Sequence, residues 1–390
     1  MTKYPKFTLI CATTCFVMAA LGTKISLAYW ASAVNGANAN NNGTVNTGTW
    51  DRYTTGTAIS TCSGLRSFLQ STTSSTYHLT TDLSCPTTNL TNSSKTFSGT
   101  FYGNGFTISD ISITSGRVGL FYSLSGATIQ NLILDNINIG TSSTYSRVNN
   151  YTGILAGRIN GANTVIQKIR IYNSSAYCRN SYGIGAIAGY ATRSTTISNV
   201  MLQNVKLDSS SSSCGGLIGR INGASLDISD IYVEGTMKAT QGSGGLIGTV
   251  DNNSSNVVVV NRAVVYGNTN IQATSYYAGG IVGNNQRNSS SHQLTDIFFT
   301  GTLDSTSNRA GTISNNVAMN FTNAWAAQWD SSTIASYSSM TGASAPASNY
   351  INSISNLTEV WWNNSLPTIA TSGRWIHDIA TYLFELKPKV

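Results

Sequence analysis

The sequence has few charged residues, little proline and few long hydrophobic runs. Only 9% of its 390 residues are Asp, Glu, Lys or Arg, although 41% are hydrophobic. This balance excludes an acidic disordered chain and is unusual for a cytosolic enzyme. Pro occurs 5 times, whereas Gly occurs 36 times and Ser, Thr and Asn are frequent throughout. We therefore expect an all-β protein whose surface is hydrated through hydroxyl and amide groups instead of charges.

The positive charge is small and spread along the chain. The formal net charge is +7, and three of the basic residues, Lys3, Lys6 and Lys24, lie in the segment that we expect to be removed. No run of Lys and Arg forms the basic stripe that a nucleic-acid partner requires. The short glycine-rich motifs of this sequence precede apparent strands and not helices, which argues against a nucleotide cofactor.

The N-terminus predicts a signal peptide over residues 1–28. Lys3 and Lys6 precede the apolar stretch Phe7–Leu21, and Ser26 and Ala28 are small residues at the positions that a signal peptidase requires. The apolar stretch is short for a membrane span, and no second one follows. We therefore expect a mature protein that has no membrane span and is secreted, with association at the cell surface as an option.

Four cysteines remain after the expected signal peptide, an even number that is typical of disulfides in an exported chain. Three pairings are open. The favoured one joins nearest neighbours in sequence, and four unpaired thiols are the alternative. No Cys-x-x-Cys pair or group of His accompanies these residues, so no metal site is predicted. The favoured bridges are Cys62–Cys85 and Cys178–Cys214.

An apolar pair flanked by glycines recurs along the middle of the chain. Its spacing of roughly 30 residues indicates a solenoid of about six repeats. A degenerate first copy is Gly119-Leu-Phe-Tyr122. The full copies are Gly153-Ile-Leu-Ala-Gly157, Gly185-Ala-Ile-Ala-Gly189, Gly215-Gly-Leu-Ile-Gly219, Gly244-Gly-Leu-Ile-Gly248 and Gly279-Gly-Ile-Val-Gly283.

A second pattern follows each copy, in which Ile, Val and Leu alternate as in a strand and are interrupted by Asn or Asp. Aligned copies give one column of Asn131, Lys168, Asn199, Asp230, Asn261 and Asp296. A second column consists of Asn136, Asn173, Asn204, Gly235, Gly267 and Gly301. Asn, Asp and Gly tolerate a left-handed backbone, so both columns are predicted to be bends that stack from repeat to repeat.

Such repeats predict a right-handed parallel β-helix of about six rungs, spaced about 4.8 Å apart, with aliphatic side chains filling a narrow core. We assign the repeats to residues 76–305. Residues 29–75 are predicted to form an N-terminal segment and cap. Residues 306–390 lose the repeat and gain tryptophan. They are predicted to form an aromatic-rich C-terminal cap, and a sugar-stacking site on exposed tryptophans is the alternative.

Two stretches of sequence resemble known families. The segments Tyr77–Leu83 and Phe97–Ile108, together with the Gly-Gly-Leu-Ile-Gly words, resemble bacterial surface proteins with GLUG-type repeats. This resemblance covers roughly residues 76–304 and implies a secreted or surface β-helix linked to adhesion. Residues 27–50 resemble the processed region of SipW-type signal-peptidase substrates, which include biofilm-matrix fibre proteins such as TasA. The second resemblance implies a matrix role, in which residues 29–50 complete a neighbour's sheet and the chain self-associates.

Parallel β-helices also include enzymes that cut polysaccharides, which need paired carboxylates, an acidic calcium site or a basic residue placed as the base. The chain has only 15 acidic residues, and the closest pair within the repeats, Asp227 and Asp230, recurs in no adjacent copy. His292 is expected to be a solvated loop residue. We therefore predict no catalytic residue and no cofactor, and we expect that the chain is not an enzyme. A polysaccharide lyase or hydrolase is the alternative.

The loops between the repeats are rich in Ser, Thr and Asn, and loops of this kind often carry the binding surface of a solenoid. Exposed aromatic side chains such as Tyr276 and Tyr277 would add contact area for a ligand. We therefore predict a secreted or cell-surface structural and adhesive protein that binds a glycan, or a surface or matrix protein, through polar loops and one solenoid face. A matrix fibre subunit is the alternative.

Overall fold

The structure is a computed structural model, and the chain divides into two units, Met1–Trp50 and Asp51–Val390, of which the second is described. The predicted signal peptide, residues 29–50, Gly267, Trp329, Trp361 and Trp362 lie outside the described residues. The described residues are 52–86, 94–113, 118–143, 151–179, 182–210, 212–266, 269–287, 291–305, 310–311, 314–315, 319–327, 350–351, 364–365, 369, 375–378 and 383–386.

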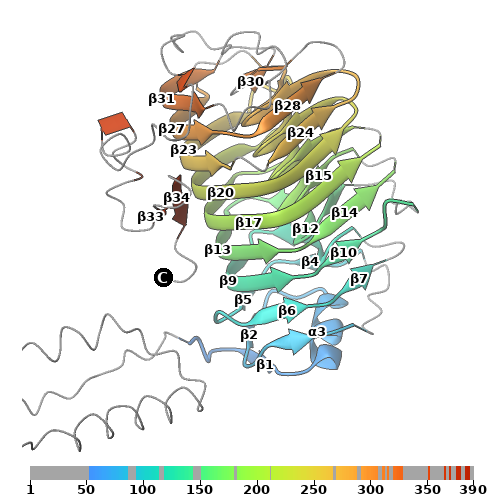
Figure 1. Cartoon of the computed structure of the whole chain (residues 1–390). Coiled ribbons are helices and arrows are strands. Elements are labelled where there is room, and N and C mark those ends of the chain that lie inside the picture. The colour runs from blue at the N-terminus through green and yellow to red at the C-terminus, as the bar shows by residue number, and fades with distance from the viewer. Residues whose placement is uncertain are drawn as a thin grey trace, which may run out of the picture. The chain divides into compact units, whose positions relative to one another are not determined.

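The second unit is a coil of short strands that stack in parallel in three sheets (Figure 1). We call them the long, the eight-stranded and the six-stranded sheet. The long sheet contains β1 (Thr57–Ile59), β2 (Thr76–Leu79), β3 (Leu83–Ser84), β5 (Thr100–Tyr102), β6 (Thr107–Ser109), β7 (Ser112–Ile113), β9 (Thr128–Asp135), β10 (Asn138–Ile139), β13 (Thr164–Tyr172), β14 (Ser175–Cys178), β17 (Thr195–Ser209), β20 (Ser225–Ala239), β23 (Val257–Val265), β24 (Asn270–Ala273), β27 (Gln293–Phe299), β28 (Thr302–Ser305), β31 (Asn320–Ala327) and β32 (Tyr350–Ile351).

The two smaller sheets complete each rung. The eight-stranded sheet contains β4 (Thr96–Phe97), β8 (Phe121–Ser125), β12 (Ala156–Gly161), β16 (Ala188–Ala191), β19 (Ile218–Ile221), β22 (Ile247–Val250), β26 (Val282–Asn285) and β30 (Ser314–Asn315). The six-stranded sheet contains β11 (Thr152–Gly153), β15 (Ile184–Gly185), β18 (Ser213–Gly215), β21 (Gly242–Gly244), β25 (Tyr277–Gly279) and β29 (Ala310–Gly311). The predicted right-handed parallel β-helix of about six turns is confirmed.

The first glycine of each repeated word forms a tight corner between the six-stranded and the eight-stranded sheet. A Cβ atom at this glycine would lie under 3.0 Å from the carbonyl oxygen of the residue three positions later, a distance that real Cβ atoms do not show. The corner is therefore so narrow that only glycine fits, which explains why the word recurs. The five corner glycines are Gly153, Gly185, Gly215, Gly244 and Gly279.

The long strands bend at one residue with a left-handed backbone, and these residues stack. Asn131, Lys168, Asn199, Asp230 and Asp296 have φ angles between 53° and 56°. The structure extends this column to other rungs with Arg262 and Asn323, and it places Asp110 in the second column, opposite Asn136. In the second predicted column, Asn136, Asn173 and Asn204 have positive φ, and the Nδ2 of Asn204 donates to the Oδ1 of Asn173 at 2.8 Å.

One expected member of the first column is misplaced. Asn261 lies opposite Ser229, and Arg262 takes the left-handed position opposite Asp230. The alternation of inward side chains decides this register, because Val258 and Val260 are both buried and the bend follows two residues later. The Nε and Nη2 of Arg262 also donate to the carboxylate of Asp230 at 2.7 and 3.1 Å, which compensates a buried charge.

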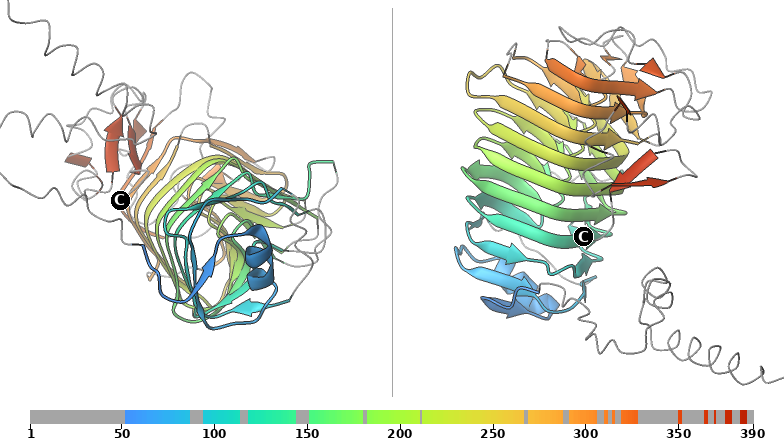
Figure 2. Two further views of the ribbon diagram at one scale, coloured as in Figure 1. Left: turned by 90° about the horizontal axis from the view of Figure 1, so that it is seen from below. Right: turned by 90° about the vertical axis from the view of Figure 1, so that its left-hand side faces the viewer.

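The N-terminal end of the coil is covered by α3 (Cys62–Leu69), the one helix among the described residues 52–327 (Figure 2). Thr61 caps it, because its side-chain oxygen accepts from the backbone N–H of Gly64. Leu65, Phe68 and Leu69 are buried against the first rungs. Parallel pairing begins at β1, within the segment 29–75 that the sequence assigned to the cap.

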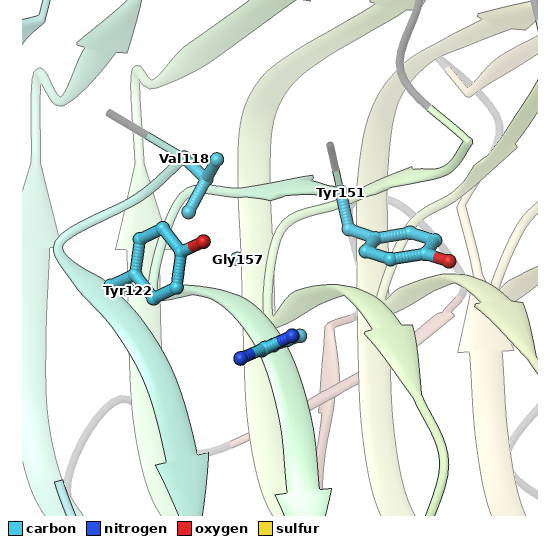
Figure 3. A pocket seen from close by; sticks show the side chains of 5 residues that line it. Val118, Tyr122, Tyr151 and Gly157 are labelled. Atoms are coloured by element: carbon cyan, nitrogen blue, oxygen red, sulfur yellow. The ribbon is translucent and has the colours of Figure 1, made fainter. Parts of the chain in front are cut away.

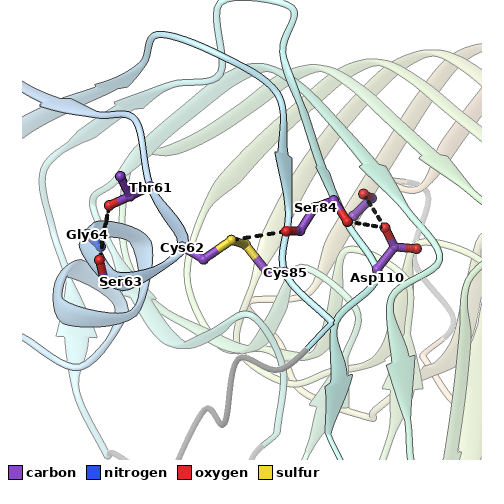
Figure 4. Close-up of a disulfide and its surroundings, with 8 residues drawn as sticks. Thr61, Cys62, Ser63, Gly64, Ser84, Cys85 and Asp110 are labelled. Carbon is purple, nitrogen blue, oxygen red and sulfur yellow. Dashed lines mark hydrogen bonds between the residues drawn. A yellow bond between two sulfur atoms is a disulfide. The ribbon is translucent and has the colours of Figure 1, made fainter.

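One of the two favoured disulfides is present. Cys62, at the start of α3, is bonded to Cys85, which follows β3 (Figure 4). The bridge ties the helix to the first rungs of the coil, and it fits a protein that folds in an oxidising compartment. Among the described residues, no helix is long and apolar enough to cross a membrane.

The second favoured bridge, Cys178–Cys214, is wrong. Both cysteines are free and buried, and they lie in different sheets, on β14 and β18. The Sγ of Cys214 donates instead to the carbonyl oxygen of Leu207 at 3.6 Å. Burial raises the pKa of the Cys178 thiol to about 12, so this residue stays in the thiol form.

The C-terminal segment continues the coil and then lies beside it. β31 pairs in parallel with β27, and β29 pairs with β25, so the rungs continue beyond residue 305. The antiparallel hairpin of β33 (Trp375–Asp378) and β34 (Leu383–Leu386) lies along the flank, next to β20 (Figure 1). The part of this segment that the structure describes therefore differs from a simple end cap.

A stripe of outward-facing side chains on the long sheet is buried, although it is separate from the solenoid core. These residues lie opposite one another in successive rungs and are between 0% and 5% exposed. Their burial and the position of β34 beside β20 together indicate that the hairpin of β33 and β34 helps to cover this face. We call Arg170, Met201, Tyr232, Val264 and Phe298 the outer stripe.

Candidate ligand-binding surface

A column of outward-facing residues runs along the eight-stranded sheet, one from each rung. The parallel register places Arg158 opposite Ser123 in the rung below and opposite Tyr190 in the rung above. Tyr190 lies in turn opposite Arg220, and Arg220 lies opposite Thr249. The middle of the column, from Arg158 through Tyr190 to Arg220, therefore alternates cationic and aromatic side chains on one sheet face.

Residues just before the six-stranded sheet lie against this column. The rings of Tyr151 and Tyr190 are stacked, with centroids 3.9 Å apart and an angle of 7° between their planes. Tyr182 lies 5.6 Å from Tyr151 between ring centroids and is 55% exposed. The glycine corner brings these segments together, because it folds each short strand back against the eight-stranded sheet. We call Tyr122, Tyr151, Arg158, Tyr182 and Tyr190 the tyrosine–arginine surface.

A shallow pocket opens at the lower end of this surface. It is lined by Val118, Tyr122, Tyr151, Gly157 and Arg158. Figure 3 shows the rings of Tyr122 and Tyr151 on opposite sides of Gly157, with Val118 above. A Cβ atom at Gly157 would lie 2.2 Å from the Cγ2 of Val118, so glycine is needed there for Val118 to pack against the strand. The pocket is small, and it brings two aromatic side chains and one cation to one place on the surface.

Arg158 is held in place at two points. Its Nε donates to the Oγ of Ser123 at 3.3 Å, and its guanidinium carbon lies 5.5 Å from the ring centroid of Tyr122. The Oγ of Ser123 donates to Asn160 at 2.9 Å, so the serine is itself oriented. A guanidinium over an aromatic face is stabilised by the ring quadrupole. Neither contact uses a hydrogen bond of the terminal nitrogens of Arg158, and within the described part of the chain these nitrogens can still donate to a ligand.

Tyr151 remains neutral at ordinary pH. Burial, together with the neighbouring Tyr190, raises the pKa of Tyr151 to about 12, while Arg220 acts in the opposite direction. The Tyr151 hydroxyl therefore keeps its proton and can serve as both a donor and an acceptor. The surface combines flat apolar rings with hydroxyl groups at their edges.

The residues that the sequence singled out for ligand contact lie on the same side of the coil but several rungs away. Tyr276 is 46% exposed, and its ring centroid lies 6.1 Å from that of Tyr277. Successive registers of the six-stranded sheet place Tyr277 in the column of Tyr151, four rungs higher. At about 4.8 Å per rung the two tyrosine pairs are about 19 Å apart.

The sequence reasoning missed Tyr122, Tyr151, Tyr182 and Tyr190. A signal was present for two of them. Tyr151 and Tyr182 come within three residues before a corner glycine, as Tyr276 and Tyr277 do. Aromatic residues at this position of the repeat share one side of the solenoid.

The acidic pair that the sequence considered for catalysis does not converge. Asp227 is exposed, whereas Asp230 is buried at the bend and bonded to Arg262. His292, expected to be solvated, is fully buried, and its Nδ1 accepts from the backbone N–H of Val258 at 3.1 Å. Its burial follows from its place at the start of a long strand, opposite Val258. Within the described residues, no group of three His, Cys, Asp or Glu side chains could hold a metal ion.

The comparisons with known proteins show likeness in structure alone. No family model and no curated protein matches the sequence. A solved structure described as "a putative immunoglobulin A1 protease from Bacteroides ovatus" is 15% identical, with a TM-score of 0.50, over 85% of this chain and 92% of that chain. Another, described as "IgA1 Protease", is 18% identical, with a TM-score of 0.46, over 69% of this chain and 21% of that chain. At this identity the first likeness shows that the two chains share the β-solenoid fold.

The expectation that the chain is not an enzyme is corrected by this finding. That expectation rested on the absence of paired carboxylates, which polysaccharide-cutting solenoids need. The Bacteroides ovatus structure has the same fold and bears the name of a protease. A missing acidic pair therefore does not exclude enzymes from solenoids of this kind, because other chemistry can be associated with the fold.

Proposed function

We propose that this chain is an extracellular β-solenoid that binds extended glycans along the side of the coil that carries the tyrosine–arginine surface. The observation that carries the proposal is the exposed group of tyrosine rings around the pocket, with Arg158 at its floor. The apolar faces of sugar rings pack on tyrosine, and the phenol hydroxyls can bond to sugar hydroxyls.

The repeat supports an extended ligand. The upper tyrosines, Tyr276 and Tyr277, lie on the same side about 19 Å from the lower ones. A chain of sugars that lies parallel to the coil axis would reach both groups, and two weak contacts on one ligand raise its overall affinity. Binding of this kind suits an adhesive protein at a cell surface or in a matrix, as the GLUG-type and SipW-type resemblances imply.

A panel of immobilised glycans and matrix proteins tests this proposal. We expect the purified chain to bind at least one glycan class, and the double variant Tyr151→Ala/Tyr182→Ala to lose about tenfold or more in affinity, since each ring supplies contact energy. The matched control is Tyr53→Ala, which removes another exposed tyrosine in a different place, stacked on Tyr102. Equal loss in the control, or no glycan binding at all, would refute the proposal.

A second candidate function follows from the likeness to the Bacteroides ovatus structure. In this alternative the solenoid belongs to a protease, and the same surface would hold a polypeptide substrate. Incubation of the chain with immunoglobulin A1, followed by separation of the fragments by size, tests it directly. New fragments would favour the protease, whereas intact immunoglobulin together with glycan binding would favour the first proposal.

A further inference from the structure

We propose that the pocket at Arg158 selects an acidic sugar, one that carries a carboxylate, within the glycan. The inference rests on the proposed glycan-binding function and makes its ligand more specific. The carboxylate would accept hydrogen bonds from the terminal nitrogens of Arg158, and the sugar ring would lie over the pocket, against Tyr122 and Tyr151.

Arg158 carries a charge that the described part of the chain leaves uncompensated. Its one hydrogen bond there goes to the neutral Ser123, and its second contact is with the neutral ring of Tyr122. The ion pairs among the described residues are Arg220–Asp251 and Arg262–Asp230, and neither includes Arg158. A half-buried cation without a carboxylate partner favours an anionic ligand.

Arg220 in the same column is an arginine whose charge is compensated within this fold. It lies two rungs above Arg158, and its Nε donates to both carboxylate oxygens of Asp251 at 2.9 Å. The residues opposite Arg158 are Ser123 and Tyr190, which have no carboxylate that could pair with Arg158 as Asp251 pairs with Arg220. The difference between the two arginines is therefore local to the pocket and does not follow from the repeat.

The surroundings of the pocket favour a ring over a linear acidic side chain. Tyr122 and Tyr151 lie on opposite sides of Gly157, around a small, shallow pocket (Figure 3). A pyranose ring that lies over this pocket can contact an aromatic side chain on either side, and a carboxylate on that ring can point to the guanidinium. An acidic peptide would use the charge but leave most of the aromatic surface uncovered. The shared chemistry of uronic and sialic acids is thus the expected ligand chemistry.

The test measures affinity by calorimetry for pairs of ligands that differ in charge alone. We expect the full chain to bind oligogalacturonate about tenfold or more tightly than its methyl ester, as a charge-assisted bidentate contact predicts. A sialylated oligosaccharide and its desialylated form make a second pair, which separates sialic acid from uronic acid as the source of the carboxylate. Polyglutamate is the third probe.

Arg158→Gln is expected to abolish the difference within the favoured pair. Arg158→Lys should restore part of the preference. The matched control is Arg193→Gln, because the Arg193 side chain is exposed and donates only to the adjacent carbonyl of Thr192 among the described residues. Thermal unfolding shows whether each variant is folded.

The outcomes distinguish a failure of the acidic-sugar inference from a failure of the proposed glycan-binding function. Equal affinity for charged and neutral glycans, or an unchanged preference in Arg158→Gln, would overturn the acidic-sugar inference and leave glycan binding in place. Absence of binding to every glycan would overturn the proposed function itself. Binding of polyglutamate without any acidic glycan would overturn the inference in favour of an acidic polypeptide.

Discussion

Single residues at the bends decide how each rung turns. The left-handed backbone costs about 1–2 kcal/mol for an ordinary residue, and Asn and Asp reduce that cost through local hydrogen bonds. Most rungs place Asn or Asp there, but Lys168 has a φ of 54° and an exposed side chain. This position therefore carries backbone strain that its side chain does not offset.

We predict that Lys168→Asn raises the free energy of unfolding by about 0.5–1 kcal/mol, because Asn tolerates the left-handed region. Chemical denaturation measures the change. Lys206→Asn is the control, since Lys206 is exposed on the strand β17 and pairs in register with Ser175. A stabilisation of the same size at Lys206 would show that charge removal, and not the backbone, is responsible.

His292 couples folding to pH. Burial, together with the smaller effect of the nearby Arg287, lowers the pKa of its imidazole from 6.5 to about 4. Because the unfolded chain binds the proton more tightly, the contribution of His292 to stability is complete above pH 6.5 and is lost as the pH falls toward 4. We predict that unfolding takes up about one extra proton in this window.

The variant His292→Asn should flatten this acid dependence, because the amide oxygen can still accept from Val258 and has no proton to gain. Denaturation curves between pH 4 and 8 measure the slope. At pH 8 the two proteins should differ by no more than about 1 kcal/mol, since both side chains are neutral there. An unchanged slope below pH 6.5 would contradict the assignment.

At the scale of the element, the glycine corner is the feature that the sequence predicts best. Its word recurs at nearly constant spacing because every rung needs the same close approach of backbone to backbone. The strand register is harder to predict, as Arg262 shows. Residue type favours Asn261 as the bend, whereas the inward alternation of Val258 and Val260 places it one residue later.

Gly215→Ala is expected to destabilise the chain by about 1–3 kcal/mol, because the added Cβ would meet the carbonyl oxygen of Ile218 and the backbone would have to shift. Thermal and chemical unfolding measure the loss. Gly64→Ala is the matched glycine control, since Gly64 lies in α3, where alanine is favoured. Similar losses at both positions would argue against the tight corner as the cause.

At the scale of the whole molecule, the outer stripe distinguishes this solenoid from a bare coil. The sequence could not predict it, because Val264 and Phe298 each lie directly before an inward-facing apolar residue. Inward-facing and outward-facing positions therefore form one continuous apolar run in the sequence. Their cover comes from a segment far along the chain. The tyrosine–arginine surface was missed for a similar reason, because the contact between Tyr151 and Tyr190 joins different rungs.

We predict that Val264→Lys destabilises the chain by about 2–3 kcal/mol and makes the C-terminal segment more sensitive to protease, because it places a charge under that segment. Val259→Lys is the control, since Val259 is a half-buried residue of the same strand on the other side of the bend. Unfolding curves and limited proteolysis give the two readouts. Equal sensitivity in both variants would contradict a covered outer stripe.

The most direct test of the binding proposal is a crystal structure of the chain with the glycan that binds it most tightly. We predict density for a sugar ring packed on Tyr151 or Tyr182, with the glycan running along the coil axis toward Tyr276. A glycan bound elsewhere, with the tyrosine–arginine surface empty, would contradict the account.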